Sequence, residues 1–229
     1  MDRCGAYRGR VCLDQYEMMK RILMIVMAVA MATVAVAQTD VPLSDKQSQE
    51  VMAQLTEAAM GMKTMQCRFV QSKVSTMLAE PSVAEGTMHF ASPDKMRWEY
   101  TVPYAFALVV NGDRIVKVTD GKAEVLDGKS GRMYQGMVGL IMGSASGKKL
   151  FDTTVFDVVM YDEDAFWRAE MTPKRRDMKR MFSQLVFRFD KKTKGISRVE
   201  FKDAGGDLTS IHFEDIKLNE AIGEKVFAE

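Results

Sequence analysis

The sequence predicts a mainly β, α+β domain built as one long antiparallel meander with few helices. Apolar and polar residues alternate with a period of two through most of residues 67–217. Turn sequences such as Asn111-Gly112-Asp113 separate these segments. Helical spacing occurs in two places only, near the front of the chain and in its middle. An apolar sheet face needs cover, so we expect the sheet to curl around these helices.

The N-terminal part of the chain has the composition of an export sequence. Lys20-Arg21 precede an uncharged apolar run that ends in Ala35-Val36-Ala37. A basic patch, a short apolar run and an A-x-A site are the parts of a secretory signal peptide. The run is short for the ~20 residues of a membrane anchor, which is the alternative. We therefore expect a dispensable extension from an over-long gene model at 1–17, a signal peptide at 18–37 that is cleaved after Ala37, and one exported domain at 38–229.

Composition limits the class of protein further. Hydrophobic residues make up 47% of the 229 residues, enough for a core within one domain. The residues after Ala37 hold 27 basic and 28 acidic side chains, a formal charge near −1, which argues against nucleic acid as a partner. Of the cysteines, only Cys67 follows Ala37, so we expect neither a disulfide framework nor a thiolate metal site.

The first expected element after the export sequence is an amphipathic helix over residues 44–62. Ser44 followed by Gln47 matches a capping box. Apolar residues then recur at helical spacing: Val51, Met52, Leu55, Ala58, Ala59 and Met62.

Strands follow the helix in two groups, one before residue 127 and one after residue 156. Turn sequences at 92–94, 111–113 and 120–122 separate several of them. The expected segments, in order, are 67–69, 86–90, 96–100, 106–110, 115–119, 123–126, 157–162, 166–171, 185–189, 196–202 and 208–217.

Residues 132–147 interrupt the strand pattern between the two groups. Met133, Met137, Leu140 and Ile141 form a helical stripe that glycines interrupt. Each interior glycine costs a helix ~1 kcal/mol relative to alanine, so we expect a marginal, mobile helix that acts as a lid.

A basic segment at 174–180 is interpreted as a hairpin loop or as a docking patch for an anionic partner or lipid headgroup.

No catalytic or metal-binding set is recognisable. His89 and His212 stand between apolar neighbours of opposite phase, which places both on the outer face. Gly143-Ser144-Ala145-Ser146-Gly147 has alanine where a nucleophile elbow has serine. Asp162-Glu163-Asp164 lack the spacing of a calcium loop. We therefore expect no enzyme, no metal site and no cofactor.

What remains is an apolar face on alternating strand positions. Of the 20 methionines, 14 follow Ala37, and their flexible side chains suit varied apolar ligands. Together with the glycine-weakened helix, this predicts a lidded hydrophobic cavity, with ordinary core as the plainer alternative. The candidate lining residues are Met88, Phe90, Met96, Trp98, Tyr100, Phe106, Leu108, Phe187 and Phe189.

One series of motifs is more specific. Phe69-Val70-Gln71, the strand 85–90, the turn 92–94 leading to Arg97-Trp98, and 108–113 resemble the LolA-type carriers of outer-membrane lipoproteins in order and spacing. The second half of that family is similar to Met171-Thr172-Pro173, 206–213 and Asn219. The resemblance covers most of residues 44–227.

The resemblance implies an unclosed antiparallel β-barrel of about eleven strands with a helical lid. It implies a periplasmic protein that binds the acyl chains of lipid-modified proteins. Such a carrier shuttles its cargo from an inner-membrane lipoprotein-releasing transporter to an outer-membrane acceptor. The alternative is a periplasmic domain that senses lipids or lipoproteins in envelope stress signalling on a similar half-barrel. An enzyme acting on lipids, a third class, would need a nucleophile and a base.

Two positions depart from the family pattern. Ser92 stands where the family has a lid-latching arginine before the turn proline. Ser92 shares the inward phase of Phe90, so we expect it to contact the lid without a charge, whereas Arg97 has the opposite phase. The chain also ends soon after Phe227, without the extra tail of well-known members.

Overall fold

The computed structural model describes residues 40–77, 80–127 and 150–228. The chain divides into two units, 1–40 and 41–229, and the fold below is that of the second. No helix in the described part of the chain is long and apolar enough to cross a membrane.

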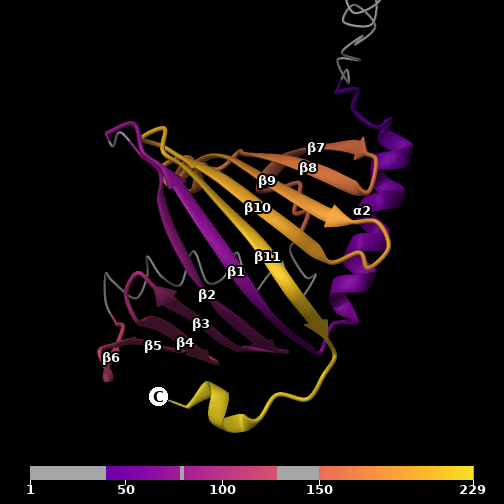
Figure 1. Ribbon diagram of the computed structural model, residues 1–229. Helices are drawn as coiled ribbons and strands as arrows, with labels where there is room; N and C mark the ends of the chain where they lie inside the picture. Colours follow the sequence, from indigo (N-terminus) through magenta and orange to yellow (C-terminus); the bar gives the residue numbers. More distant parts are fainter. Residues whose placement is uncertain (1–39, 78–79, 128–149, 229) are drawn as a thin grey trace, which may run out of the picture. The chain divides into compact units, whose positions relative to one another are not determined.

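A single sheet of 11 antiparallel strands forms the framework (Figure 1). Its spatial order is β6-β5-β4-β3-β2-β1-β11-β10-β9-β8-β7. The edge strands β6 and β7 do not pair with each other, so the barrel stays open. The strands are β1 (Thr64–Val74), β2 (Ser82–Ala91), β3 (Lys95–Val102), β4 (Phe106–Asn111), β5 (Arg114–Thr119), β6 (Lys122–Val125), β7 (Phe156–Glu163), β8 (Phe166–Pro173), β9 (Phe182–Asp190), β10 (Ile196–Asp203) and β11 (Leu208–Leu218). The expected unclosed antiparallel barrel is thereby confirmed.

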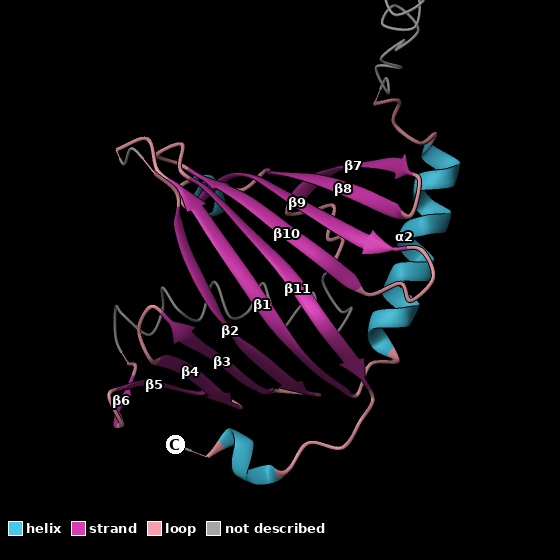
Figure 2. Ribbon diagram, in the orientation of Figure 1, coloured by secondary structure: helices cyan, strands magenta, loops and turns pink. Residues whose placement is uncertain are grey.

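Helix α2 (Asp45–Met60) precedes the sheet and begins where the sequence predicts. The Ser44 side chain accepts a hydrogen bond from the Gln47 backbone N–H, and the Gln47 side chain bonds back to the Ser44 backbone. Val51 and Leu55 are buried against residues of β7, β8 and β9. Figure 2 shows α2 running past the adjacent ends of β7 to β10. The helix therefore covers one part of the inner sheet face.

Two apolar clusters line the inner face of the sheet. The first joins β1, β2, β3 and β4 around Phe69 and Trp98, and the second joins α2 to β7, β8 and β9 around Phe187 and Phe189. Phe201 of β10 packs against both. The inner face is therefore a continuous apolar surface between the two halves of the sheet.

The C-terminal 3-10 helix η1 (Glu224–Phe227) contacts β3 and β4. Phe227 is 5% exposed, and Arg97 Nη1 donates a hydrogen bond to the Ala228 carbonyl at 3.3 Å. On β4, residues 107–110 are buried without alternation. Side chains that point to either face of β4 are therefore buried, so the strand is covered on its outer face as well as on its inner one.

One segment differs from expectation. A four-residue helix, α4 (Arg176–Lys179), connects β8 to β9 where a hairpin loop was one interpretation. The Lys179 backbone N–H donates a hydrogen bond to the Arg175 carbonyl, which forms one turn of helix.

Candidate ligand cavity

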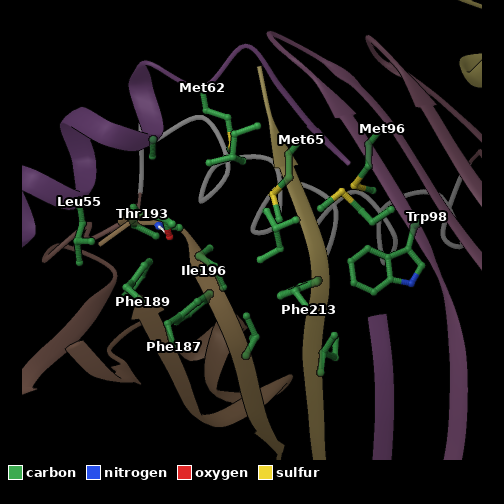
Figure 3. A pocket seen from close by; sticks show the side chains of 18 of the residues that line it. Leu55, Met62, Met65, Met96, Trp98, Phe187, Phe189, Thr193, Ile196 and Phe213 are labelled. Atoms are coloured by element: carbon green, nitrogen blue, oxygen red, sulfur yellow. Dashed lines mark hydrogen bonds between the residues drawn. The ribbon is translucent and has the colours of Figure 1, made fainter. Parts of the chain in front are cut away.

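The cavity lies between α2 and the inner face of the sheet and has a volume of about 410 Å³. Such a volume falls within the range of about 300–1,000 Å³ that is usual for small-molecule sites. Figure 3 shows Leu55 and Thr193 on one side and Met96 and Trp98 on the other. The lining is almost entirely apolar, with Gln71, Thr193, Lys194 and Asn219 among its few polar members. Apolar walls favour hydrocarbon ligands in general, because burial removes the hydrocarbon from water.

Nearly all of the predicted lining residues meet at this cavity, although they come from distant strands. They are Met88 of β2, Met96, Trp98 and Tyr100 of β3, Phe106 and Leu108 of β4, and Phe187 and Phe189 of β9.

Phe90 is the exception. It is 1% exposed and belongs to the first apolar cluster, but it does not line the cavity. Its cross-strand neighbours Met65 and Met96 line the cavity instead. Phe90 therefore belongs to the packed core. The strand phase predicted that its side chain points inward, but the phase does not say how far that side chain lies from the cavity.

The sequence-based list lacked several lining residues from α2 and from the middle of the sheet. Ala58, Ala59 and Met62 were recognised as a helical stripe but were not assigned to the cavity. Leu55 belongs to the same stripe. Others follow the period-two pattern of β1, β10 and β11, which could have identified them; among these are Met65, Val199, Phe201, Ile211 and Phe213.

Aromatic rings pack closely in the wall that β1, β3 and β11 form. Phe69 lies 4.4 Å from Trp98 and 5.2 Å from Tyr100 between ring centroids, and Phe213 lies 6.1 Å from Trp98. The Tyr100 hydroxyl donates to Gln71 Oε1 at 3.0 Å. Rings in offset and edge-on contact hold one another in place, so this wall is preorganised.

The exposed lining residues gather at one end of the cavity. Gly61 follows α2, Thr193 lies in the β9–β10 turn, and Asn219 follows β11. Ile216 and Leu218 near the end of β11 are each 36% exposed. Strand register agrees, because β10 pairs with both β9 and β11 and brings the turn beside the end of β11. This end, called the mouth below, is where the lining reaches the surface.

The predicted lid residues Met133, Met137, Leu140 and Ile141 lie outside the described residues. Ser92 is described, and its expected inward direction is wrong: it is exposed in the turn between β2 and β3. The strand alternation stops at Ala91, and the Ser92 backbone N–H donates to the Lys63 carbonyl at 2.8 Å. A turn does not continue the phase of the strand before it.

Among the described residues, the pKa values of Cys67 and His89 are shifted. Among described residues, no group of three or more His, Cys, Asp or Glu side chains is placed to hold a metal ion. Cys67 is buried beside Met88, and burial raises the pKa of its thiol to about 12. Burial lowers the pKa of His89, and the neighbouring Arg97 lowers it further.

A protein-family model described as "Outer membrane lipoprotein carrier protein LolA" matches residues 60–228. The chain belongs to the LolA family. An outer-membrane lipoprotein carrier protein from Neisseria gonorrhoeae is 26% identical over 201 residues, which are 88% of this chain and 89% of that protein. The carrier protein from Methylobacillus flagellatus is 26% identical over 144 residues, which are 62% of this chain and 66% of that protein.

Solved structures resemble the chain in fold. A LolA superfamily protein from Nitrosomonas europaea matches with a TM-score of 0.44 and 12% identity, covering 79% of this chain and 97% of that one. The Mycobacterium tuberculosis lipoprotein LppX matches with a TM-score of 0.48 and 13% identity. The match covers 79% of this chain and 99% of that one. The MucA/MucB complex of Pseudomonas aeruginosa matches with a TM-score of 0.46 and 13% identity. The match covers 80% of this chain and 61% of that one.

Proposed function

We propose that this chain is a periplasmic carrier that binds the acyl chains of lipoproteins and shuttles them from the inner to the outer membrane. The observation that carries the proposal is an apolar cavity of about 410 Å³ in a member of the LolA family. Its partners are lipid-modified proteins, an inner-membrane transporter that releases them and an outer-membrane acceptor. It acts by binding, without catalysis.

Export is part of the same proposal. A signal peptide cleaved after Ala37 would leave a mature chain that begins at Gln38, and N-terminal sequencing of the periplasmic protein tests this. The lid that we assign to Met133, Met137, Leu140 and Ile141 would cover the bound chain.

The size of the cavity sets a moderate affinity. Transfer of an acyl chain from water gains ~0.8 kcal/mol per buried methylene, so burial of about ten methylenes gains roughly 8 kcal/mol. If association costs are small, this corresponds to micromolar binding. A carrier without its own energy source benefits from such an affinity, because tighter binding would slow transfer of the cargo to the next protein.

Binding of an acylated peptide to two cavity variants tests the proposal. Leu108 is 4% exposed, so Leu108→Glu places an unpaired carboxylate in the wall and should abolish binding. Val102→Glu is the matched control, because Val102 lies on β3 but is 49% exposed. Fluorescence of Trp98 reports occupancy, with Trp167 as background because Trp167 does not line the cavity.

A second variant avoids the buried charge, which could unfold the protein. Ala59→Phe on α2 fills part of the cavity and should weaken binding, whereas Ala53→Phe on the exposed side of the same helix should not. If Ala59→Phe and Leu108→Glu both kept their circular dichroism and bound acylated peptide like the wild type, the carrier role would be wrong. A sensing or scaffolding role would then take its place.

A further inference from the structure

Lys194 is the only charged residue among the described residues that line the cavity. It lies in the β9–β10 turn beside Thr193 and Gly195, which also line the cavity. The rest of the wall is apolar apart from a few neutral polar side chains. A charged residue in the lining of an apolar cavity is a feature that hydrocarbon binding alone does not require.

The turn that carries Lys194 is fixed by Asp190. The Asp190 carboxylate accepts hydrogen bonds from the backbone N–H groups of Lys192 and Thr193 at 3.0 and 2.8 Å, and from the Thr193 hydroxyl at 3.1 Å. The Lys194 N–H donates to the Asp190 carbonyl at 2.7 Å. These bonds hold Thr193 and Lys194 in a defined position at the mouth.

Lys194 adopts a left-handed backbone conformation, with φ of +57°. Glycine and asparagine are the usual residues in this region, because a side chain there crowds the backbone. Residues in such conformations persist where the surrounding structure holds them, and they are frequent at ligand sites. The turn therefore keeps a lysine where a glycine would fit more easily.

The three lysines of this segment differ in their surroundings. Lys191 pairs with Asp162, and its ammonium also donates to the Asp164 carbonyl. Lys192 is exposed and does not line the cavity. The Lys194 side chain makes no ion pair or hydrogen bond within the described part of the chain. Its ammonium is therefore available to a ligand at the mouth.

We propose that Lys194 forms a head-group subsite that selects acyl ligands carrying an anionic group next to the chain. The inference rests on the proposed acyl-binding function and names the class of ligand. The hydrocarbon lies in the apolar cavity while a carboxylate or phosphate at its head meets the Lys194 ammonium at the mouth. Apolar walls of low dielectric strengthen such an attraction relative to bulk water.

Titration with ligands of equal chain length tests the subsite. The probes are dodecyl phosphate and dodecanol below their aggregation limits, followed by Trp98 fluorescence and calorimetry. Wild-type protein should bind dodecyl phosphate about tenfold more tightly than dodecanol, as expected for one charge-assisted contact. Lys194→Met keeps an unbranched side chain one atom shorter than lysine, and it should remove this preference without weakening dodecanol binding.

Lys192→Met is the matched control, because it removes a positive charge from the same turn without touching the cavity lining. It should keep the tenfold preference. Two dodecanoyl peptides with Asp or Asn beside the acylated residue identify the source of the anion. Tighter binding of the Asp peptide assigns the subsite to the peptide part of a lipoprotein, and a preference limited to dodecyl phosphate assigns it to a phospholipid head.

Equal binding of dodecyl phosphate and dodecanol by the wild type would overturn the subsite but leave acyl binding standing. A preference that survives in Lys194→Met would also overturn it. Binding of neither ligand would overturn the proposed function itself.

Discussion

Phe69 on β1 lies directly across from Gly86 on β2, and its ring occupies the space that a side chain at position 86 would need. A Cβ atom on Gly86 would lie 2.6 Å from Phe69 Cζ and 1.9 Å from the Glu99 carbonyl oxygen. Because Phe69 in turn packs on Trp98, the glycine sets the depth of the aromatic wall of the cavity.

Gly86→Ala should therefore destabilise the protein. The clash with the Glu99 backbone cannot be relieved by a rotamer change, so β2 and β3 must shift, at a cost of roughly 1–3 kcal/mol, as for other overpacked cores. Urea unfolding measures this loss. Gly223→Ala is the control, since a Cβ there meets nothing within 4 Å, and an equal loss of stability in both variants would contradict the explanation.

His89 on the outer side of β2 predicts a loss of stability in mild acid. It pairs across the strands with Arg97, and both burial and the Arg97 charge lower its pKa below 6.5, while Glu99 opposes the shift. Below about pH 6.5 the unfolded chain takes up a proton that the folded chain resists, so the free energy of unfolding falls as the pH falls.

Urea unfolding between pH 7.5 and 5.0 measures this slope. His89→Gln should flatten it, because glutamine does not titrate. A slope that is the same in wild type and His89→Gln would assign the acid sensitivity to other groups.

Cys67 predicts slow thiol chemistry in the folded protein. Burial raises its pKa from 9.0 to about 12, which lowers the thiolate fraction at pH 8 by about a thousandfold. Iodoacetamide should modify Cys67 at the rate at which β1 opens, and urea should restore the rate of a free thiol. Acylated peptide should slow modification further, because it stabilises the folded state. Peptide mass mapping that found Cys67 modified within minutes in native buffer would contradict the buried thiol.

Much of the fold could be predicted because its determinants are local. The Ser44–Gln47 capping box and the Asn111-Gly112-Asp113 turn depend on residues adjacent in sequence. The turn forms a two-residue hairpin in which Asn111 pairs with Arg114 and Gly112 has φ of +61°. Alternation then gives the inner face of each strand, which is why eight of the nine candidate residues line the cavity.

The remaining features depend on contacts between distant segments. Ala107 and Val109 have the outward phase of β4 but are 3% and 1% exposed. They are covered by η1, a C-terminal segment whose sequence has no helical or strand periodicity that would predict this contact. Phe90 has the inward phase but lies in packed core, and Lys194 belongs to a turn whose position depends on the pairing of β10 with β11. Local patterns contain none of this information.

Arg168 is another feature that alternation does not predict. It faces away from Ala169 and Met171, which are buried in the second apolar cluster, and so points to the outer side of β8. An outward arginine is expected to be solvated, but Arg168 is only 6% exposed. Its guanidinium lies 2.6 Å from Glu163, contacts Glu170, and lies 4.0 Å from the centre of the Tyr161 ring. It thereby links β7 to β8 at an edge of the sheet.

Arg168→Met should remove this link and leave Glu170 without its ion-pair partner, whereas Glu163 keeps its pair with Arg188. The cost should be roughly 2–4 kcal/mol, below that of a fully buried pair because Glu163 and Glu170 keep 28% and 27% exposure. Arg168→Lys should recover only part of it, since an ammonium lacks the planar fork that reaches both carboxylates. Arg198→Met is the control on β10, where the arginine side chain is 44% exposed and its pair with Glu200 should contribute less than about 1 kcal/mol. Urea unfolding of the three variants decides the matter: if Arg168→Met cost no more than Arg198→Met, burial of the Arg168 guanidinium would not stabilise the edge of the sheet.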